Sequence, residues 1–201
     1  MGFRAGFRPF AASCVAVLLL GACGHVPVLS MLKLARIDFK TTDPARLRIA
    51  VKLPSSIKPQ RDKLRLRVTV QLPGNPDSTQ DFVLSEISDP AELAMLRKEV
   101  DADAHVFAYR LDTSEANKLA AFREDLLRKK QEGTRGGGLK IDVVPEACRS
   151  GAVAVGEVPF TTYLRTPETG GYLTLTEDVD MRTVVPGRDL VSEMPACGPA
   201  G

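Results

Sequence analysis

Apolar and polar residues alternate with a period of two along most of the chain, which is the spacing of a β-strand with one buried and one exposed face. The clearest segment is "KLRLRVTVQL", residues 63–72, whose leucines and valines all fall on one face. Segments with a similar pattern lie at residues 35–40, 47–53, 79–87, 105–111, 139–143, 160–166 and 172–178. The pattern therefore predicts about eight short strands, with a hairpin turn at residues 167–171 between the last two.

Two segments between the strands begin with helix-capping sequences. Asp89 is followed by Pro90 and a glutamate, and Asp112 is followed by a second capping pattern that ends in Glu115. The first signal predicts a helix in "AELAMLRKEV", and the second predicts a longer helix that ends near Gln131. The buried stripe of the longer helix is expected to consist of Leu119, Phe122 and Leu126.

Many short strands and two helices predict a mainly β domain of the α+β class. We expect an antiparallel, sandwich-like domain of about eight short strands, with the two helices on one edge or face. A single antiparallel sheet is the competing arrangement. This one β-rich domain is expected to occupy residues 31–201.

The N-terminal segment has the order of parts found in an export signal. Arg4 and Arg8 precede an apolar run at residues 10–20, which is too short to span a bilayer, and no acidic residue occurs before Asp38. The run ends in Leu20-Gly21-Ala22-Cys23.

This arrangement resembles the lipobox signal peptide of bacterial lipoproteins. The resemblance implies that residues 1–22 are a removed signal peptide, that Cys23 carries a diacylglyceryl thioether, and that residues 23–30 are a lipidated tether. Two or three acyl chains anchor a protein durably, at about 0.8 kcal/mol per buried methylene. An ordinary secretory signal with an incidental cysteine and an N-terminal transmembrane anchor are the alternatives.

The residue after Cys23 and the length of the tether predict which membrane holds the protein and how close the domain lies to it. Gly24 stands where an aspartate would favour retention at the inner membrane in enteric-type sorting, so the outer membrane, on its periplasmic face, is the expected site. A tether of residues 24–30 reaches about 25 Å when extended, which places the domain against its membrane.

The balance of charged residues limits the classes of partner that the protein is expected to bind. The chain has 27 Lys plus Arg against 25 Asp plus Glu, and loss of Arg4 and Arg8 with the signal makes the two equal. A neutral domain argues against a general nucleic-acid binder, so no nucleic-acid partner is expected. The lack of tryptophan, with only three tyrosines, argues against sugar binding by aromatic stacking.

Two cysteines, Cys148 and Cys197, remain once Cys14 leaves with the signal and Cys23 is acylated. In an oxidising compartment they are expected to form a disulfide, which on the chain-entropy estimate contributes roughly 4 kcal/mol. A metal-binding pair is the alternative, but no further cysteine or suitably spaced histidine completes a site. No metal or other cofactor is predicted.

Basic residues occupy the exposed face of two predicted strands. Arg48 and Lys52 share the face of one strand, and Lys63, Arg65 and Arg67 share that of another. If the strands are neighbours, these residues form a positive patch suited to anionic headgroups, lipopolysaccharide phosphates or an acidic envelope protein. A solvated face balanced by acids elsewhere is the alternative.

Other chemical signals are weak. His105 is not accompanied by a nucleophile motif, "GTRGGG" follows a helix instead of opening one, and Glu177, Asp178 and Asp180 lack the spacing of an EF-hand loop. No catalytic residue is therefore predicted. The sequence favours a membrane-anchored, non-catalytic binding or assembly accessory of the cell envelope. A structural subunit of a larger envelope complex and an enzyme of unfamiliar type are the alternatives.

Overall fold

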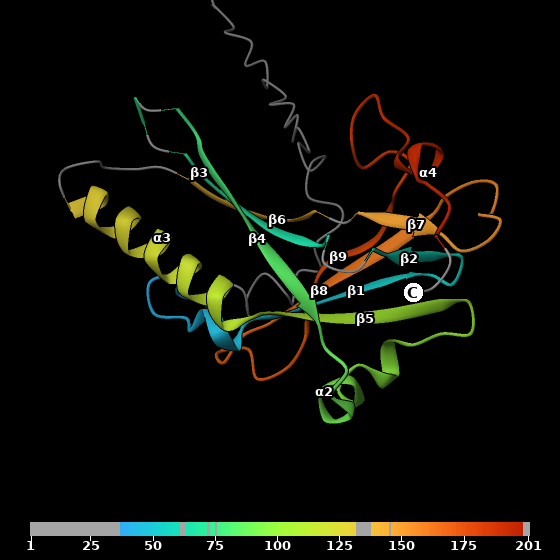
Figure 1. Ribbon diagram of the computed structural model, residues 1–201, viewed down its shortest axis with the longest axis horizontal. Coiled ribbons are helices and arrows are strands. Elements are labelled where there is room, and N and C mark those ends of the chain that lie inside the picture. The colour runs from blue at the N-terminus through green and yellow to red at the C-terminus, as the bar shows by residue number, and fades with distance from the viewer. Residues whose placement is uncertain are drawn as a thin grey trace, which may run out of the picture.

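The computed structural model describes residues 37–60, 63–71, 73–74, 76–131, 138–144 and 146–198 (Figure 1). The strands are β1 (Arg48–Pro54), β2 (Ile57–Pro59), β3 (Arg65–Gln71), β4 (Ser78–Glu86), β5 (Ala104–Leu111), β6 (Gly138–Val144), β7 (Ala147–Arg149), β8 (Pro159–Arg165) and β9 (Leu173–Asp180). The α-helices are α2 (Pro90–Ala94), α3 (Thr113–Gln131) and α4 (Leu190–Glu193), and the 3₁₀ turns are η1 (Pro44–Arg46) and η2 (Arg97–Glu99).

Seven strands form one curled antiparallel sheet in the order β6-β3-β4-β5-β1-β8-β9, and β2 and β7 form a separate two-stranded sheet. The predicted mainly β, α+β class with antiparallel strands is therefore confirmed. Strands predicted at 47–53, 63–72, 79–87, 105–111 and 139–143 correspond to β1, β3, β4, β5 and β6. The predicted hairpin is the β8–β9 pair.

One face of the sheet carries the main core. Leu66, Val68 and Val70 of β3 alternate as predicted and pack with Phe82 of β4 under helix α3. The predicted stripe of α3, Leu119, Phe122 and Leu126, contacts this cluster. At the other end of the same face, Val51 and Leu53 of β1 pack against the small β2–β7 sheet and α4. In Figure 1, α3 (yellow) and α4 (red) accordingly lie over opposite ends of the sheet.

Described residues cover the opposite face around β5, β1 and β8. Leu93 and Leu96, from the α2 segment, pack there with Ala50, Ala108 and Tyr163. Asp89 caps α2 by accepting a hydrogen bond from the Ala91 amide at 3.0 Å, as the sequence predicts. The helix nevertheless ends at Ala94, because only two leucines anchor it and such a short stripe cannot sustain a longer amphipathic helix.

The strands β4 and β5 pair over only three positions, Leu84↔Leu111, Ser85↔Arg110 and Glu86↔Tyr109. Where they separate, the Val83 amide donates to the Glu115 carboxylate of α3 at 3.1 Å. The buried Glu115 thus replaces the missing strand partner and lets the sheet curl around α3.

Some elements differ from the predicted ones. Residues 39–41 form a turn and not a strand, because the Asp38 carboxylate accepts from the Lys40 amide and the Asp38 carbonyl accepts from the Thr42 amide. The elements β2, β7 and α4 are too short to leave a periodic pattern. None of the described helices is long and apolar enough to cross a membrane. The predicted signal peptide, residues 1–22, the tether, residues 23–30, and most of "GTRGGG" lie outside the described residues.

Candidate functional site

The predicted disulfide joins Cys148 of β7 to Cys197, across a sequence separation of 49 residues. It holds the C-terminal segment beside β7, and the backbone reinforces it: the Arg149 amide donates to the Pro195 carbonyl and the Cys197 amide to the Arg149 carbonyl, both at 2.8 Å. The tail therefore continues the small sheet as a short parallel bridge between Arg149 and Ala196.

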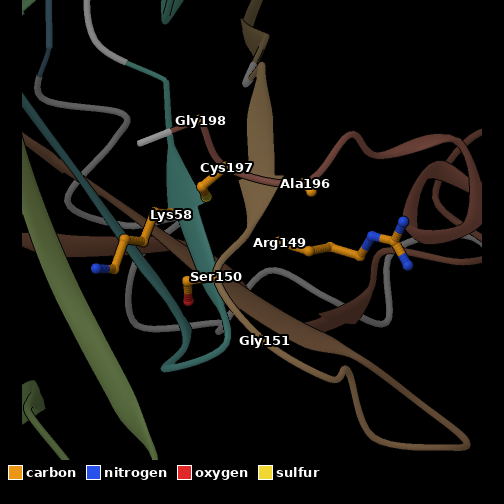
Figure 2. A pocket seen from close by; sticks show the side chains of 7 residues that line it. All are labelled: Lys58, Arg149, Ser150, Gly151, Ala196, Cys197 and Gly198. Carbon is orange, nitrogen blue, oxygen red and sulfur yellow. The ribbon is translucent and has the colours of Figure 1, made fainter. Parts of the chain in front are cut away.

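An open hollow of about 490 Å³ lies beside this disulfide, between β2, β7 and the tail (Figure 2). Its two cations do not converge, because Figure 2 shows the side chains of Lys58 and Arg149 extending in opposite directions. Arg149 is also engaged, since its Nε donates to the Met194 carbonyl at 3.0 Å. The hollow thus offers no set of groups aimed at a common ligand.

The predicted basic residues fall into two separate groups. Arg48 and Lys52 lie on β1, whereas Arg65 and Arg67 lie on β3 and Lys63 lies two residues before its start. Strands β4 and β5 stand between β1 and β3 in the sheet, so the condition for a single positive patch is not met. The prediction of one patch fails because the sequence does not reveal the order of the strands in the sheet.

The group around β3 is balanced by acids. Arg67 donates two hydrogen bonds to the Asp81 carboxylate, at 2.7 and 2.8 Å, across the β3–β4 pair. These bonds lower the pKa of Asp81, to which the charge of Arg65 also contributes. Lys63 pairs with Glu146 at 3.4 Å. This part of the predicted basic face is therefore a solvated, charge-paired surface.

The group on β1 meets a different set of neighbours. Lys52 forms an ion pair with Asp101. Arg48 lies directly opposite Arg110 of β5 and, on its other side, directly opposite Arg165 of β8. Because directly paired residues in a sheet share a face, these three arginines form a row across three adjacent strands. We refer to Arg110, Arg48 and Arg165 as the arginine row.

A single carboxylate from α2 enters the arginine row. Glu92 accepts hydrogen bonds from Arg165 and from the Tyr172 hydroxyl, the latter at 2.8 Å, and its second oxygen lies 4.0 Å from Arg48 Nε. Burial opposes ionisation of Glu92, but the hydrogen bonds from Arg165 and Tyr172 and the charges of Arg165 and Arg48 outweigh it and lower the pKa. Glu92 is therefore held as a carboxylate between two arginines.

Sequence reasoning singled out only Arg48 of this arrangement. Arg110 and Arg165 each occupy a polar position of an alternating strand, and Glu92 lies in the predicted helix. The pattern therefore predicts that each of them is at the surface. The missing information was which strands are neighbours.

The other candidate groups have structural roles or no partner groups. The Asp180 carboxylate accepts from the amides of Val158 and Arg182, and Asp178 accepts from the Thr161 hydroxyl, so both stabilise their own hairpin. His105 is exposed, and its ring lies edge to face with that of Phe107, with ring centroids 6.4 Å apart. Among the residues that the structure describes, no three His, Cys, Asp or Glu side chains are grouped to hold a metal ion.

Comparison of this chain with protein-family models, curated proteins and solved structures finds no match. The arginine row with Glu92 is thus identified from its own geometry alone. Its chemistry is cationic, and guanidinium groups in fixed positions suit phosphate and carboxylate oxygens.

Proposed function

We propose that the protein is a lipoprotein of the bacterial envelope, anchored through acyl chains on Cys23 at the periplasmic face of the outer membrane. Its β-rich domain would act as a non-catalytic binding or assembly accessory. The observation that carries the proposal is the ordered N-terminal sequence, in which two arginines, an apolar run and Leu20-Gly21-Ala22-Cys23 follow one another.

The Cys148–Cys197 disulfide supports the same compartment, because disulfides form and persist in oxidising spaces such as the bacterial periplasm. The bilayer is the first proposed partner, through the acyl chains. Anionic headgroups or an acidic envelope protein are the second, through the arginines of the domain. Neither a cofactor nor a nucleic acid is part of the proposal.

The test compares the protein purified from membranes with its Cys23→Ser and Cys14→Ser variants. We expect an intact mass that corresponds to an acylated chain beginning at Cys23, and we expect Cys23→Ser to lose both the acyl mass and detergent-phase partitioning. Cys14→Ser is the matched control, because it alters a cysteine of the apolar run and leaves the lipobox intact. An unacylated native protein would overturn the proposal.

Extraction in a mild detergent then separates an accessory from a structural subunit. An accessory is expected to leave the membrane largely as the free protein, with its partner recovered only after chemical cross-linking. Stoichiometric co-purification with a stable complex would instead indicate a structural subunit.

A further inference from the structure

We propose that the end of the sheet carrying the arginine row faces the membrane and binds the phosphate groups of anionic phospholipids. This inference rests on the proposed lipid anchor and adds to it a specific orientation of the domain and a specific lipid class.

The first argument is the charge of the row. Like charges placed directly opposite one another in a sheet are destabilising, yet Arg110, Arg48 and Arg165 occupy three consecutive cross-strand positions. Among the described residues, Glu92 is the one acid paired with the row, and it binds on the side of Arg48 and Arg165. Positive charge therefore exceeds negative charge in the row, which is complementary to an anionic surface.

The second argument is the availability of the guanidinium groups. Arg48 is held in place because its Nη1 donates to the carbonyls of Ala45 and Leu47, both at 2.9 Å. Arg110 is exposed, and within the described part of the chain it has no ion pair and no side-chain hydrogen bond. The row thus combines a fixed arginine with an adjacent free one, and η1 adds the exposed Arg46 at the same end.

The third argument is the place where the described chain begins. The Thr42 hydroxyl donates to Glu168 in the β8–β9 turn at 3.0 Å, and Arg123 of α3 donates to the Thr42 carbonyl at 2.7 Å. These bonds fix the entry segment at the end of the sheet where β1 starts and β5 and β8 finish. Figure 1 shows the same grouping, with the blue entry segment beside the first turns of α3 and the orange β8–β9 turn.

The arginine row and the first described residues of the chain therefore lie at the same end of the domain. Cys23 lies fourteen residues before Ile37, a stretch that spans at most about 50 Å, so acylation tethers this end within about 50 Å of the membrane surface. A basic side chain near an anionic leaflet contributes about 1 kcal/mol, and confinement makes the contact effectively intramolecular. A phospholipid phosphate is consequently the anion that this surface meets at the highest local concentration.

The experiment uses the acylated protein, confirmed by intact mass, reconstituted into vesicles of phosphatidylcholine alone or mixed with phosphatidylglycerol. An arginine-selective dicarbonyl reagent labels exposed guanidinium groups, and peptide mass spectrometry reads each site. We expect labelling of Arg110 and Arg46 to fall about fivefold in the anionic vesicles, and to recover at high salt because exposed charges are screened. Arg149 and Arg188, near the opposite end of the sheet, are exposed and serve as internal controls.

Variants test whether the row itself is responsible. Arg110→Gln should reduce the lipid-dependent protection of Arg46, whereas Arg97→Gln, the removal of an exposed arginine from η2, should leave it unchanged. Equal labelling in both vesicles would overturn the inference, as would equal protection of Arg149 and Arg188. Protection in native membranes but not in pure lipid vesicles would also overturn it, in favour of an acidic protein partner. An absence of acylation would appear in the intact mass. It would contradict the proposed lipid anchor and not the proposed phosphate-binding surface.

Discussion

At the scale of single residues, Glu92 is the carboxylate that links two members of the arginine row. Its carboxylate is 13% exposed and is shared between Arg165, Arg48 and Tyr172. Such a group is costly to bury without partners and stabilising with them. The short α2 helix therefore has a second role besides covering the sheet, since it carries an acid that offsets the repulsion between neighbouring arginines.

Replacing Glu92 by glutamine should lower the free energy of unfolding by about 2 kcal/mol at pH 7, because charged hydrogen bonds are lost and two arginines are left unopposed. The lowered pKa of Glu92 means that its contribution is complete above its ordinary value of 4.5 and is lost as the pH falls through the lower, folded-state value. The difference between the two proteins should therefore narrow between pH 7 and pH 3, as urea unfolding at several pH values would show.

Glu177→Gln is the matched control, because Glu177 is exposed and forms no ion pair or hydrogen bond with another described residue. It should change the unfolding free energy little at any of these pH values. A difference between wild type and Glu92→Gln that stays constant down to pH 3 would contradict the assigned role.

At the scale of elements, the length of the pattern decides how well the sequence predicts the structure. Strand β3 and helix α3 repeat their spacing over several turns or residue pairs, and both occur where the pattern places them. In α2 and at residues 37–41, a few local contacts outweigh the periodicity. Asp38 folds its own segment into a turn, and two leucines are enough for only one turn and a half of helix.

The packing of α3 on the sheet gives a direct test of the main core. Phe82 of β4 is fully buried, and its ring meets Phe122 of α3 edge to face, with centroids 6.1 Å apart. Phe82→Ala should lower the free energy of unfolding by about 3–5 kcal/mol, because a large cavity is left between β4 and α3. Val155→Ala, at a fully exposed apolar position, should change it by less than about 0.5 kcal/mol. Urea denaturation followed by circular dichroism measures both, and similar losses for the two variants would show that α3 is not packed on β4.

At the scale of the whole molecule, the class of fold could be predicted from the sequence but the arrangement of its strands could not. Alternation assigns each arginine to an exposed face, yet it carries no information about which strand lies beside which. The predicted patch of Arg48, Lys52, Lys63, Arg65 and Arg67 assumed that β1 and β3 are neighbours, and the insertion of β4 and β5 divides it. The pairing of Cys148 with Cys197 was predictable because these are the two cysteines that remain once Cys14 is removed and Cys23 is acylated in the proposed mature chain.

The disulfide is expected to stabilise the whole domain, because it constrains the unfolded chain over a loop of 49 residues. The double variant Cys148→Ser, Cys197→Ser should lose roughly 4 kcal/mol of unfolding free energy on the chain-entropy estimate. Reducing agent should lower the stability of the wild type by a similar amount and should not affect the double variant. A wild-type protein whose denaturation curve is unchanged by reduction would contradict this expectation.

The position of β1 also has a consequence for the order of events in folding. It is the first strand of the described chain, yet it lies inside the sheet between β5, which begins at Ala104, and β8, which begins at Pro159. Pairings this distant in sequence require the closure of long loops and slow the folding of a domain. When a chain emerges with its N-terminus first, β1 therefore remains unpaired until β5 and then β8 have also emerged. During that time β1 can pair with incorrect strands.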